Sequence, residues 1–234
     1  MRILGIEQPD QIHLLKKEDL VGGTIHKDEF DHLLRVVGGL WLHSGDPSAP
    51  HAELTGGECS DGFVDTLRLL KYPNVCLLLA EQMANIYTAY MAKLPAWVIG
   101  SDHAAATFSF AVAYHLKAKH AFTEKGPDGK TQLWKRETIK PGEIVLHAEE
   151  LVTTTATLDR VHDGIVEGNT HPVTFAPVSL TLVHRSSSYE FNGGDILYFR
   201  HYDINKWKPE ECPLCAAGSQ RLRPKQNWEQ LTAA

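Results

Sequence analysis

From residue 96 to residue 183, apolar runs of strand length alternate with helical segments, and this alternation restricts the fold more than any other feature of the sequence. The expected strands cover residues 97–100, 120–123, 144–147 and 177–183, and the expected helices cover residues 103–117 and 155–166. A helix between two strands favours a crossover that leaves the strands parallel. The pattern therefore predicts an α/β fold with a mainly parallel central sheet flanked by helices.

The flanking segments predict additions to this core. Residues 28–37 and 74–94 have apolar side chains at helical spacing, whereas residues 51–65 are punctuated by glycines between short apolar pieces, as in a hairpin. After Tyr202 the chain is rich in Pro, Lys and Arg, and Trp207 and Trp228 are expected to pack this tail. We expect residues 1–70 to form an N-terminal helix and hood, residues 71–200 the core, and residues 201–234 a C-terminal extension.

Composition excludes several classes of partner. The 234 residues carry a formal net charge of −6 and no clustered basic excess, so neither nucleic acid nor an anionic membrane is an expected partner. No apolar run reaches the length of a membrane span, and the start of the chain lacks the apolar core of a signal peptide. The four cysteines are too few and too unevenly placed for a disulfide framework. Reduced thiols and a cytoplasmic location are therefore expected.

The cysteine pair in the Cys212-Pro-Leu-Cys215 motif poses a separate question. A single pair supplies two of the four ligands of a structural zinc ion, and no second pair lies nearby in the sequence. On the sequence alone, a packed turn is favoured over a metal site.

Residues 142–157, GEIVLHAEELVTTTAT, carry the most informative chemistry. An apolar strand is expected to end at Glu149 and Glu150, and a run of small hydroxyl residues then opens a helix. Ligands of α/β sheets bind beyond the carboxyl ends of the strands, where helix N-termini offer free N–H groups. A phosphate could sit on Thr153, Thr154, Thr155, Ala156 and Thr157, while the two carboxylates accept hydrogen bonds from sugar hydroxyls or support hydrated magnesium. The alternative is a threonine-rich helix cap beside acids that favour the positive helix end.

This segment resembles the phosphoribosyl pyrophosphate signature of type I phosphoribosyltransferases, and further segments are similar to the orotate phosphoribosyltransferase branch. The resemblance implies that Glu149 and Glu150 hold the ribose, with magnesium bound through water or ribose hydroxyls, and that residues 153–157 cradle the 5′-phosphate. The sequence departs from the family pattern at Glu150, where Asp is usual, and at Thr155, where Gly is usual. A threonine cannot cheaply adopt a positive φ, so Thr155 could weaken binding.

The same resemblance assigns roles to the remaining candidate residues. Thr55 and Phe63, in the glycine-rich segment, would border the base, and Ser101, Asp102 and His103 would form the pyrophosphate loop. The polar excursion over residues 124–141 could hold a β-hairpin and a mobile loop. Lys125 and Lys130 would be the catalytic cations of its mobile part, residues 124–136, where Lys135 and Arg136 are also available. Arg185 would hold the carboxylate of orotate with its planar guanidinium.

The resemblance therefore implies a magnesium-dependent, homodimeric orotate phosphoribosyltransferase with phosphoribosyl pyrophosphate and orotate as substrates. Two alternatives stay open at this point. The base could be a purine or another base, because the phosphate loop reports the ribose phosphate and not the base. The chain could also be a non-catalytic nucleotide sensor on the same fold.

Overall fold

The computed structural model describes residues 2–233, which form two compact units. The first unit contains residues 2–12, 28–69 and 203–233, and the second contains residues 13–27 and 70–202. Both units therefore draw on separated stretches of the chain.

The second unit is built on a seven-stranded sheet with the strand order β10-β11-β9-β8-β5-β6-β7. The five central strands are parallel, and the two short edge strands run antiparallel to their neighbours. The strands are β5 (Trp97–Ser101), β6 (Lys119–Lys125), β7 (Gln132–Leu133), β8 (Ile144–Val152), β9 (Thr174–His184), β10 (Glu190–Phe191) and β11 (Gly194–His201). The predicted α/β fold with a mainly parallel sheet is confirmed.

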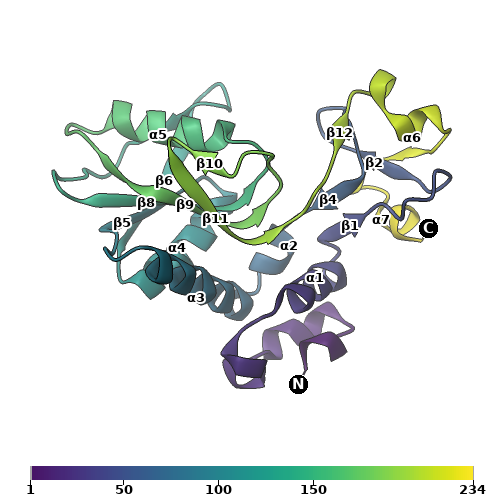
Figure 1. Cartoon of the computed structure of the whole chain (residues 1–234), viewed down its shortest axis with the longest axis horizontal. Coiled ribbons are helices and arrows are strands. Elements are labelled where there is room, and N and C mark those ends of the chain that lie inside the picture. The colour runs from purple at the N-terminus through teal and green to yellow at the C-terminus, as the bar shows by residue number, and fades with distance from the viewer. Residues whose placement is uncertain (1, 234) are drawn as a thin grey trace. The chain divides into compact units, whose positions relative to one another are not determined.

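Helices cover both faces of this sheet (Figure 1). Helices α3 (Pro73–Tyr90) and α4 (Ala104–Leu116) lie on one face, and α5 (Ala156–Gly168) lies on the other. Strand residues alternate between the two faces: Ile99 and Val145 pack with Val161 of α5, whereas a Cβ at Gly100 would meet the Ser109 side chain of α4 at 2.7 Å. Alternation therefore decides which side chains of β5 and β8 face α5.

The first unit holds two small sheets (Figure 1). The antiparallel pair joins β1 (Leu40–Leu42) to β4 (Gly62–Val64). The four-stranded sheet has the order β12 (Lys206–Trp207), β3 (Cys59–Ser60), β2 (His51–Glu53) and β13 (Arg221–Leu222). Its helices are α1 (Lys27–Val36), α6 (Pro213–Ala216) and α7 (Trp228–Thr232), while α2 (Leu67–Leu70) adjoins the second unit in sequence. The C-terminal tail is thus part of a sheet with the glycine-rich hairpin.

A small core holds the first unit together. Trp41, Ala52, Leu222 and Leu231 are buried against one another, and Trp228 packs beside them. The Arg68 guanidinium lies over the Trp228 ring at 5.4 Å from the centroid. Burying the tail's apolar side chains against β1 and β2 explains why the tail folds with residues that precede it by more than a hundred positions.

Short 3-10 turns occupy the described N-terminal residues: Ile3–Gly5, Pro9–Leu14, Lys17–Asp19 and Val21–Gly23. A fifth turn, Pro209–Glu211, precedes α6. The sequence pattern predicted none of these turns, because they have too few residues to show a helical repeat.

One expectation about element boundaries was wrong. Strand β8 does not end before the acids but continues to Val152, because β9 pairs with it through Glu149↔Thr181 and Leu151↔Val183. The excursion over residues 124–136 contains a short hairpin, as its sequence allowed, with Lys125 opposite Gln132. Its turn is held by Asp128, whose carboxylate accepts hydrogen bonds from Thr131 Oγ1 and from the N–H groups of Lys130 and Thr131, and these bonds lower the pKa of Asp128 to about 2.

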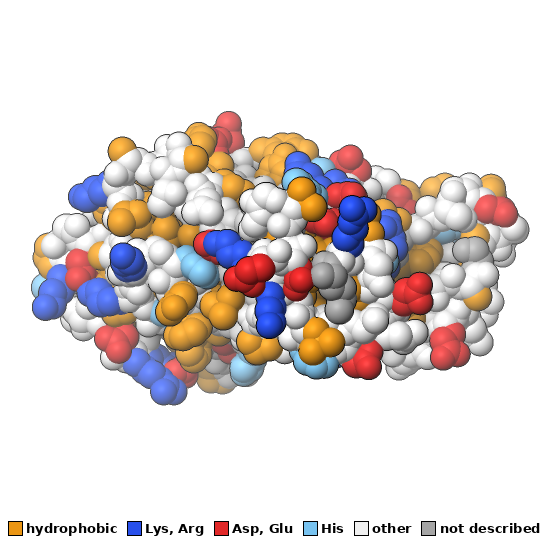
Figure 2. All heavy atoms as spheres, turned by 90° about the horizontal axis from the view of Figure 1, so that it is seen from below, with side chains coloured by type: hydrophobic (Ala, Val, Ile, Leu, Met, Phe, Trp, Pro, Cys, Tyr) orange, Lys and Arg blue, Asp and Glu red, His pale blue; other side chains and the backbone are white. Residues whose placement is uncertain are grey.

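Figure 2 shows acidic and basic side chains interspersed on the face drawn there, with no broad field of one sign. Within residues 2–233, none of the helices has the length and apolar character that crossing a bilayer requires.

Candidate functional site

A cavity of about 540 Å³ opens at the carboxyl ends of β5, β6 and β8, beside the start of α5. This edge of a parallel sheet is where ligands bind in α/β folds. The lining residues are Ser101, Asp102, Lys125, Gly129, Lys130, Gln132, Glu149, Glu150, Leu151, Thr157 and Arg160. Seven residues named from the sequence meet here, namely Ser101, Asp102, Lys125, Lys130, Glu149, Glu150 and Thr157.

Three hydrogen bonds hold Glu149 in this cavity. Its buried carboxylate accepts hydrogen bonds from the Ser101 N–H at 2.9 Å, from Ser101 Oγ at 2.8 Å and from His147 Nε2 at 2.7 Å. The tautomer with a proton on His147 Nε2 makes the last of these bonds. Glu149 therefore fixes the end of β5 to β8, a role that its position beside another acid did not predict.

Glu150 differs from Glu149 because adjacent residues of a strand point to opposite faces. Glu149 lies on the α5 side with His147, whose ring centroid is 5.4 Å from that of His162 in α5. Glu150 is half-buried and contributes to the cavity from the next position of β8. The two acids therefore have different environments, although the sequence suggested one shared role.

Of the two loop residues after β5 that were named from the sequence, only Asp102 lines the cavity. Asp102 lines the cavity, and its Oδ2 accepts a hydrogen bond from the Lys125 N–H at 3.1 Å. Among the described residues, nothing hydrogen-bonds to its buried Oδ1. His103 is exposed, with Nδ1 3.8 Å from Asp102 Oδ2, and does not line the cavity. Asp102 is thus the residue of this loop with an acceptor available to a ligand.

The threonine-rich segment forms the start of α5. Thr155 is the residue before the helix and has φ −72°, an ordinary right-handed conformation. A glycine is therefore not required there by the backbone, and the substitution of threonine for the usual residue causes no strain at that position. Thr153, Thr154 and Ala156 are exposed, Thr155 is half-buried, and only Thr157 of this segment lines the cavity.

The four cations of residues 124–136 divide into two groups. Lys125, at the end of β6, and Lys130, in the turn, line the cavity. Lys135 and Arg136 pair with Glu124 instead, at 3.5 and 2.7 Å, and line a separate hollow with His120 and Trp134. This division favours the two lysines named from the sequence as the pair that meets a ligand.

Sequence reasoning missed Gln132 and Arg160. Gln132 is buried, and its Oε1 accepts a hydrogen bond from Thr123 Oγ1 at 2.7 Å. Arg160 donates from Nη2 to Thr157 Oγ1 at 3.1 Å, and no residue in the described range hydrogen-bonds to its buried Nε. Its position three residues after Thr157 on a helix was the available signal, because residues at that spacing share a face. Arg160 supplies a cation at the proposed phosphate position.

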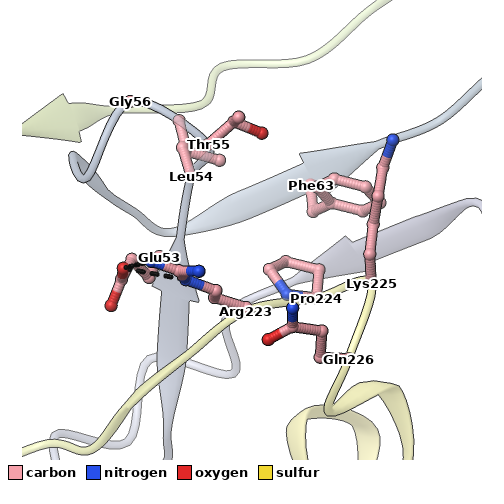
Figure 3. Close-up of a pocket in the computed structure, with 9 residues that line it drawn as sticks. All are labelled: Glu53, Leu54, Thr55, Gly56, Phe63, Arg223, Pro224, Lys225 and Gln226. Carbon is pink, nitrogen blue, oxygen red and sulfur yellow. Dashed lines mark hydrogen bonds and ion pairs between the residues drawn. The ribbon is translucent and has the colours of Figure 1, made fainter.

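The first unit has a cavity of its own, of about 420 Å³ (Figure 3). Thr55 and Phe63, both named from the sequence, line it together with the segment Arg223 to Gln226. Figure 3 shows Lys225 beside the Phe63 ring and the ion pair of Arg223 with Glu53. The two residues expected to border a base therefore share one pocket.

Arg185 follows β9, and its N–H donates to the Val152 carbonyl at 2.8 Å. This hydrogen bond places the Arg185 backbone beside the end of β8. The side chain is half-buried and does not line the cavity of the second unit. Its expected contact with a base carboxylate stays a prediction.

Comparison with known proteins gives the chain its relatives. No protein-family model matches it. The chain is 27% identical over 174 residues to the orotate phosphoribosyltransferase of Thermotoga maritima, covering 74% of this chain and 89% of the relative. It is 28% identical over 174 residues to that of Heliobacterium modesticaldum, covering 74% of this chain and 88% of the relative.

Solved structures agree on the fold. The orotate phosphoribosyltransferase of Aeropyrum pernix superposes with a TM-score of 0.53 at 15% identity, covering 74% of this chain and 93% of that one. The Mycobacterium tuberculosis enzyme in complex with inorganic phosphate gives 0.51 at 17% identity, covering 74% and 94%. By sequence this chain is therefore similar to orotate phosphoribosyltransferases over most of their length, and it shares the fold of their solved structures.

Proposed function

We propose that this chain is an orotate phosphoribosyltransferase, which transfers phosphoribosyl from phosphoribosyl pyrophosphate to orotate. The observation that carries the proposal is the alignment over 174 residues with curated enzymes of that name, because it covers nearly the full length of each. The cavity at the carboxyl edge of the sheet supports it, since acids, hydroxyls and three cations converge there as a sugar phosphate requires.

In the proposed reaction, the bond between the ribose C1′ and the pyrophosphate oxygen breaks, and a bond forms between C1′ and the N1 atom of orotate. Pyrophosphate leaves with the electron pair, and orotate loses its N1 proton. The 5′-phosphate would bind at the start of α5 near Thr157 and Arg160, where helix N–H groups and a guanidinium favour an anion. Lys125 and Lys130 would stabilise the negative charge on the departing pyrophosphate.

Glu150 and Asp102 are the acids best suited to the ribose hydroxyls and to magnesium. Glu149 already accepts three hydrogen bonds. In contrast, Asp102 Oδ1 is a buried acceptor that receives no hydrogen bond from the described residues. Magnesium is usually held by one or two carboxylates together with substrate phosphates, so this donor set fits an ion that arrives with phosphoribosyl pyrophosphate. When bound, magnesium would neutralise the pyrophosphate. A homodimer and a cytoplasmic location belong to the same proposal.

The test is an initial-rate assay with phosphoribosyl pyrophosphate and magnesium, with orotate, uracil, adenine and hypoxanthine supplied in parallel. The proposal expects turnover with orotate at a catalytic efficiency at least a hundredfold above that with the other bases, roughly 3 kcal/mol of discrimination. Faster turnover of a purine would move the proposal to another phosphoribosyltransferase. Binding of phosphoribosyl pyrophosphate with no turnover of any base would instead identify a nucleotide sensor.

A further inference from the structure

Four metal-ligating side chains from three parts of the sequence converge in the first unit. His51 begins β2 and Cys59 begins β3. Cys212 is the residue before α6, and Cys215 lies within α6. One ligand atom of each residue lies within 4.8 Å of the ligand atoms of the other three. The second pair that the Cys212-Pro-Leu-Cys215 motif lacked in the sequence is therefore supplied by the hairpin of β2 and β3.

The spacing of these atoms matches a tetrahedral ion. Cys59 Sγ is 3.5 Å from Cys215 Sγ, and His51 Nε2 is 3.4 Å from Cys215 Sγ and 3.7 Å from Cys212 Sγ. Around a tetrahedral zinc ion with its usual bond lengths, neighbouring sulfurs stand about 3.8 Å apart, and sulfur and nitrogen about 3.6 Å apart. A disulfide would need two sulfurs about 2.0 Å apart. It would also give no role to the third thiol or to the His51 imidazole.

The atoms around the cluster orient it for a metal. Ser219 Oγ donates to the Ala49 carbonyl at 2.6 Å, so at 2.7 Å it accepts the proton on His51 Nδ1. This tautomer leaves the lone pair of His51 Nε2 directed at the thiols, as metal-bound histidines are usually held. The Cys215 N–H donates to Cys212 Sγ at 3.4 Å, an interaction that favours a thiolate. His51, Cys59 and Cys212 are buried, and Cys215 is half-buried.

We propose that His51, Cys59, Cys212 and Cys215 bind one structural zinc ion. Three thiolates and one imidazole are a soft donor set that selects zinc, and four protein ligands leave no open position for a substrate. The ion would join the β2 and β3 hairpin to the C-terminal segment around α6. All four ligands lie in the first unit, whereas the cavity proposed for phosphoribosyl pyrophosphate is lined by residues of the second unit.

The first experiment is metal analysis of the full chain, purified under reducing conditions without chelator. The proposal expects about one zinc per chain in the wild type. Cys212→Ser and Cys59→Ser should lose most of it. The matched control is Cys76→Ser, which changes the remaining cysteine, buried in α3, and should keep the ion. Cobalt reconstitution of the wild type should give the intense visible absorption of a tetrahedral thiolate site.

A second variant keeps the test valid if a ligand substitution prevents folding. Ser219→Ala retains all four ligands but removes the hydrogen bond to His51, so zinc affinity measured against a chromophoric chelator should fall roughly tenfold to a hundredfold. A wild type that holds less than about a tenth of an ion per chain after incubation with zinc and reductant would overturn the proposal. So would a disulfide between Cys59 and Cys215 in the intact mass of the purified protein, or an unchanged affinity in Ser219→Ala.

Discussion

The two adjacent acids show how neighbouring residues of one motif acquire different tasks. Glu149 is buried and accepts three hydrogen bonds, two of them from Ser101 on the neighbouring strand. Glu150 occupies the next position of β8 and contributes to the cavity wall from a half-buried side chain. The strand that carries both acids decides this difference, because it turns successive side chains to opposite faces.

Substituting each acid by its amide should separate these tasks. Glu149→Gln introduces an NH2 group that must face either the Ser101 donors or His147, so we expect a loss of about 1 to 3 kcal/mol in unfolding free energy. Glu150→Gln should lower the unfolding free energy less than Glu149→Gln, because Glu150 is only half-buried, while weakening phosphoribosyl pyrophosphate binding. Urea unfolding and calorimetry on both variants measure the two effects. Equal stability losses in the pair would contradict the assignment.

Arg185 is the residue expected to read the base. Removing one partner of a desolvated, bidentate pair of arginine and carboxylate costs about 2 to 5 kcal/mol of binding free energy. Arg185→Ala should therefore lower catalytic efficiency with orotate roughly thirtyfold or more, at about 1.4 kcal/mol per factor of ten. Affinity for phosphoribosyl pyrophosphate alone should barely change. Losses of equal size in both measurements, or no loss in either, would mean that Arg185 does not contact the base.

At the scale of elements, the cations in and just after the hairpin of β6 and β7 line two different cavities. Lys125 and Lys130 line the cavity of the second unit, whereas Lys135 and Arg136 are engaged by Glu124. The turn between the strands is held by three hydrogen bonds to the Asp128 carboxylate. The element therefore presents Lys130 to the cavity on a short, locally hydrogen-bonded turn.

This sorting predicts unequal effects of lysine substitutions in one hairpin. Lys130→Ala should lower kcat with orotate by roughly tenfold to a hundredfold, because a charge that stabilises the leaving group is lost. The matched control, Lys135→Ala, removes the same charge from the other side and should change kcat less than about twofold, as an exposed ion pair contributes little. Steady-state kinetics of both variants decide it. Comparable losses would show that net charge, and not position, matters.

At the scale of the whole molecule, burial of histidine makes stability depend on pH. His162 stacks on Phe175 with ring centroids 3.7 Å apart, and burial together with the neighbouring His147 lowers the pKa of His162 to about 3. Burial also lowers the pKa of His120 and is the main cause of the lowered pKa of His184. Below the ordinary histidine pKa of about 6.5, the unfolded chain binds protons that the folded chain does not, so stability falls as pH falls towards 3.

His162→Phe tests this dependence by removing the titrating group while keeping a ring beside Phe175. For a pKa of about 3 in the folded state, the His162 contribution lost between pH 7.5 and pH 5 is roughly 2 kcal/mol. Urea unfolding at the two pH values should show a smaller stability loss in the variant by about that amount. Other titrating groups cancel in the comparison. An identical loss in both proteins would assign the acid sensitivity to other residues.

The sequence by itself determined the features that depend on local pattern. The alternation of apolar runs predicted β5, α4, β6, β8, α5 and β9 in order, and the acids followed by threonines located the start of α5 and the edge where ligands bind. Such features are encoded within a few turns of helix or one strand, where side-chain spacing and capping act directly. The relation to the orotate phosphoribosyltransferases was visible in the same stretches.

Only the tertiary structure decided which distant residues meet. Ser101 donates to Glu149, which is 48 positions away in the sequence. Cys215 lies beside His51, which is 164 positions away. The extension of β8 past the acids likewise depends on its pairing with β9. These contacts follow from strand pairing and core burial over the whole chain, which no local spacing specifies. For that reason Cys212 and Cys215 looked like an isolated pair in the sequence, whereas the folded chain brings His51 and Cys59 beside them.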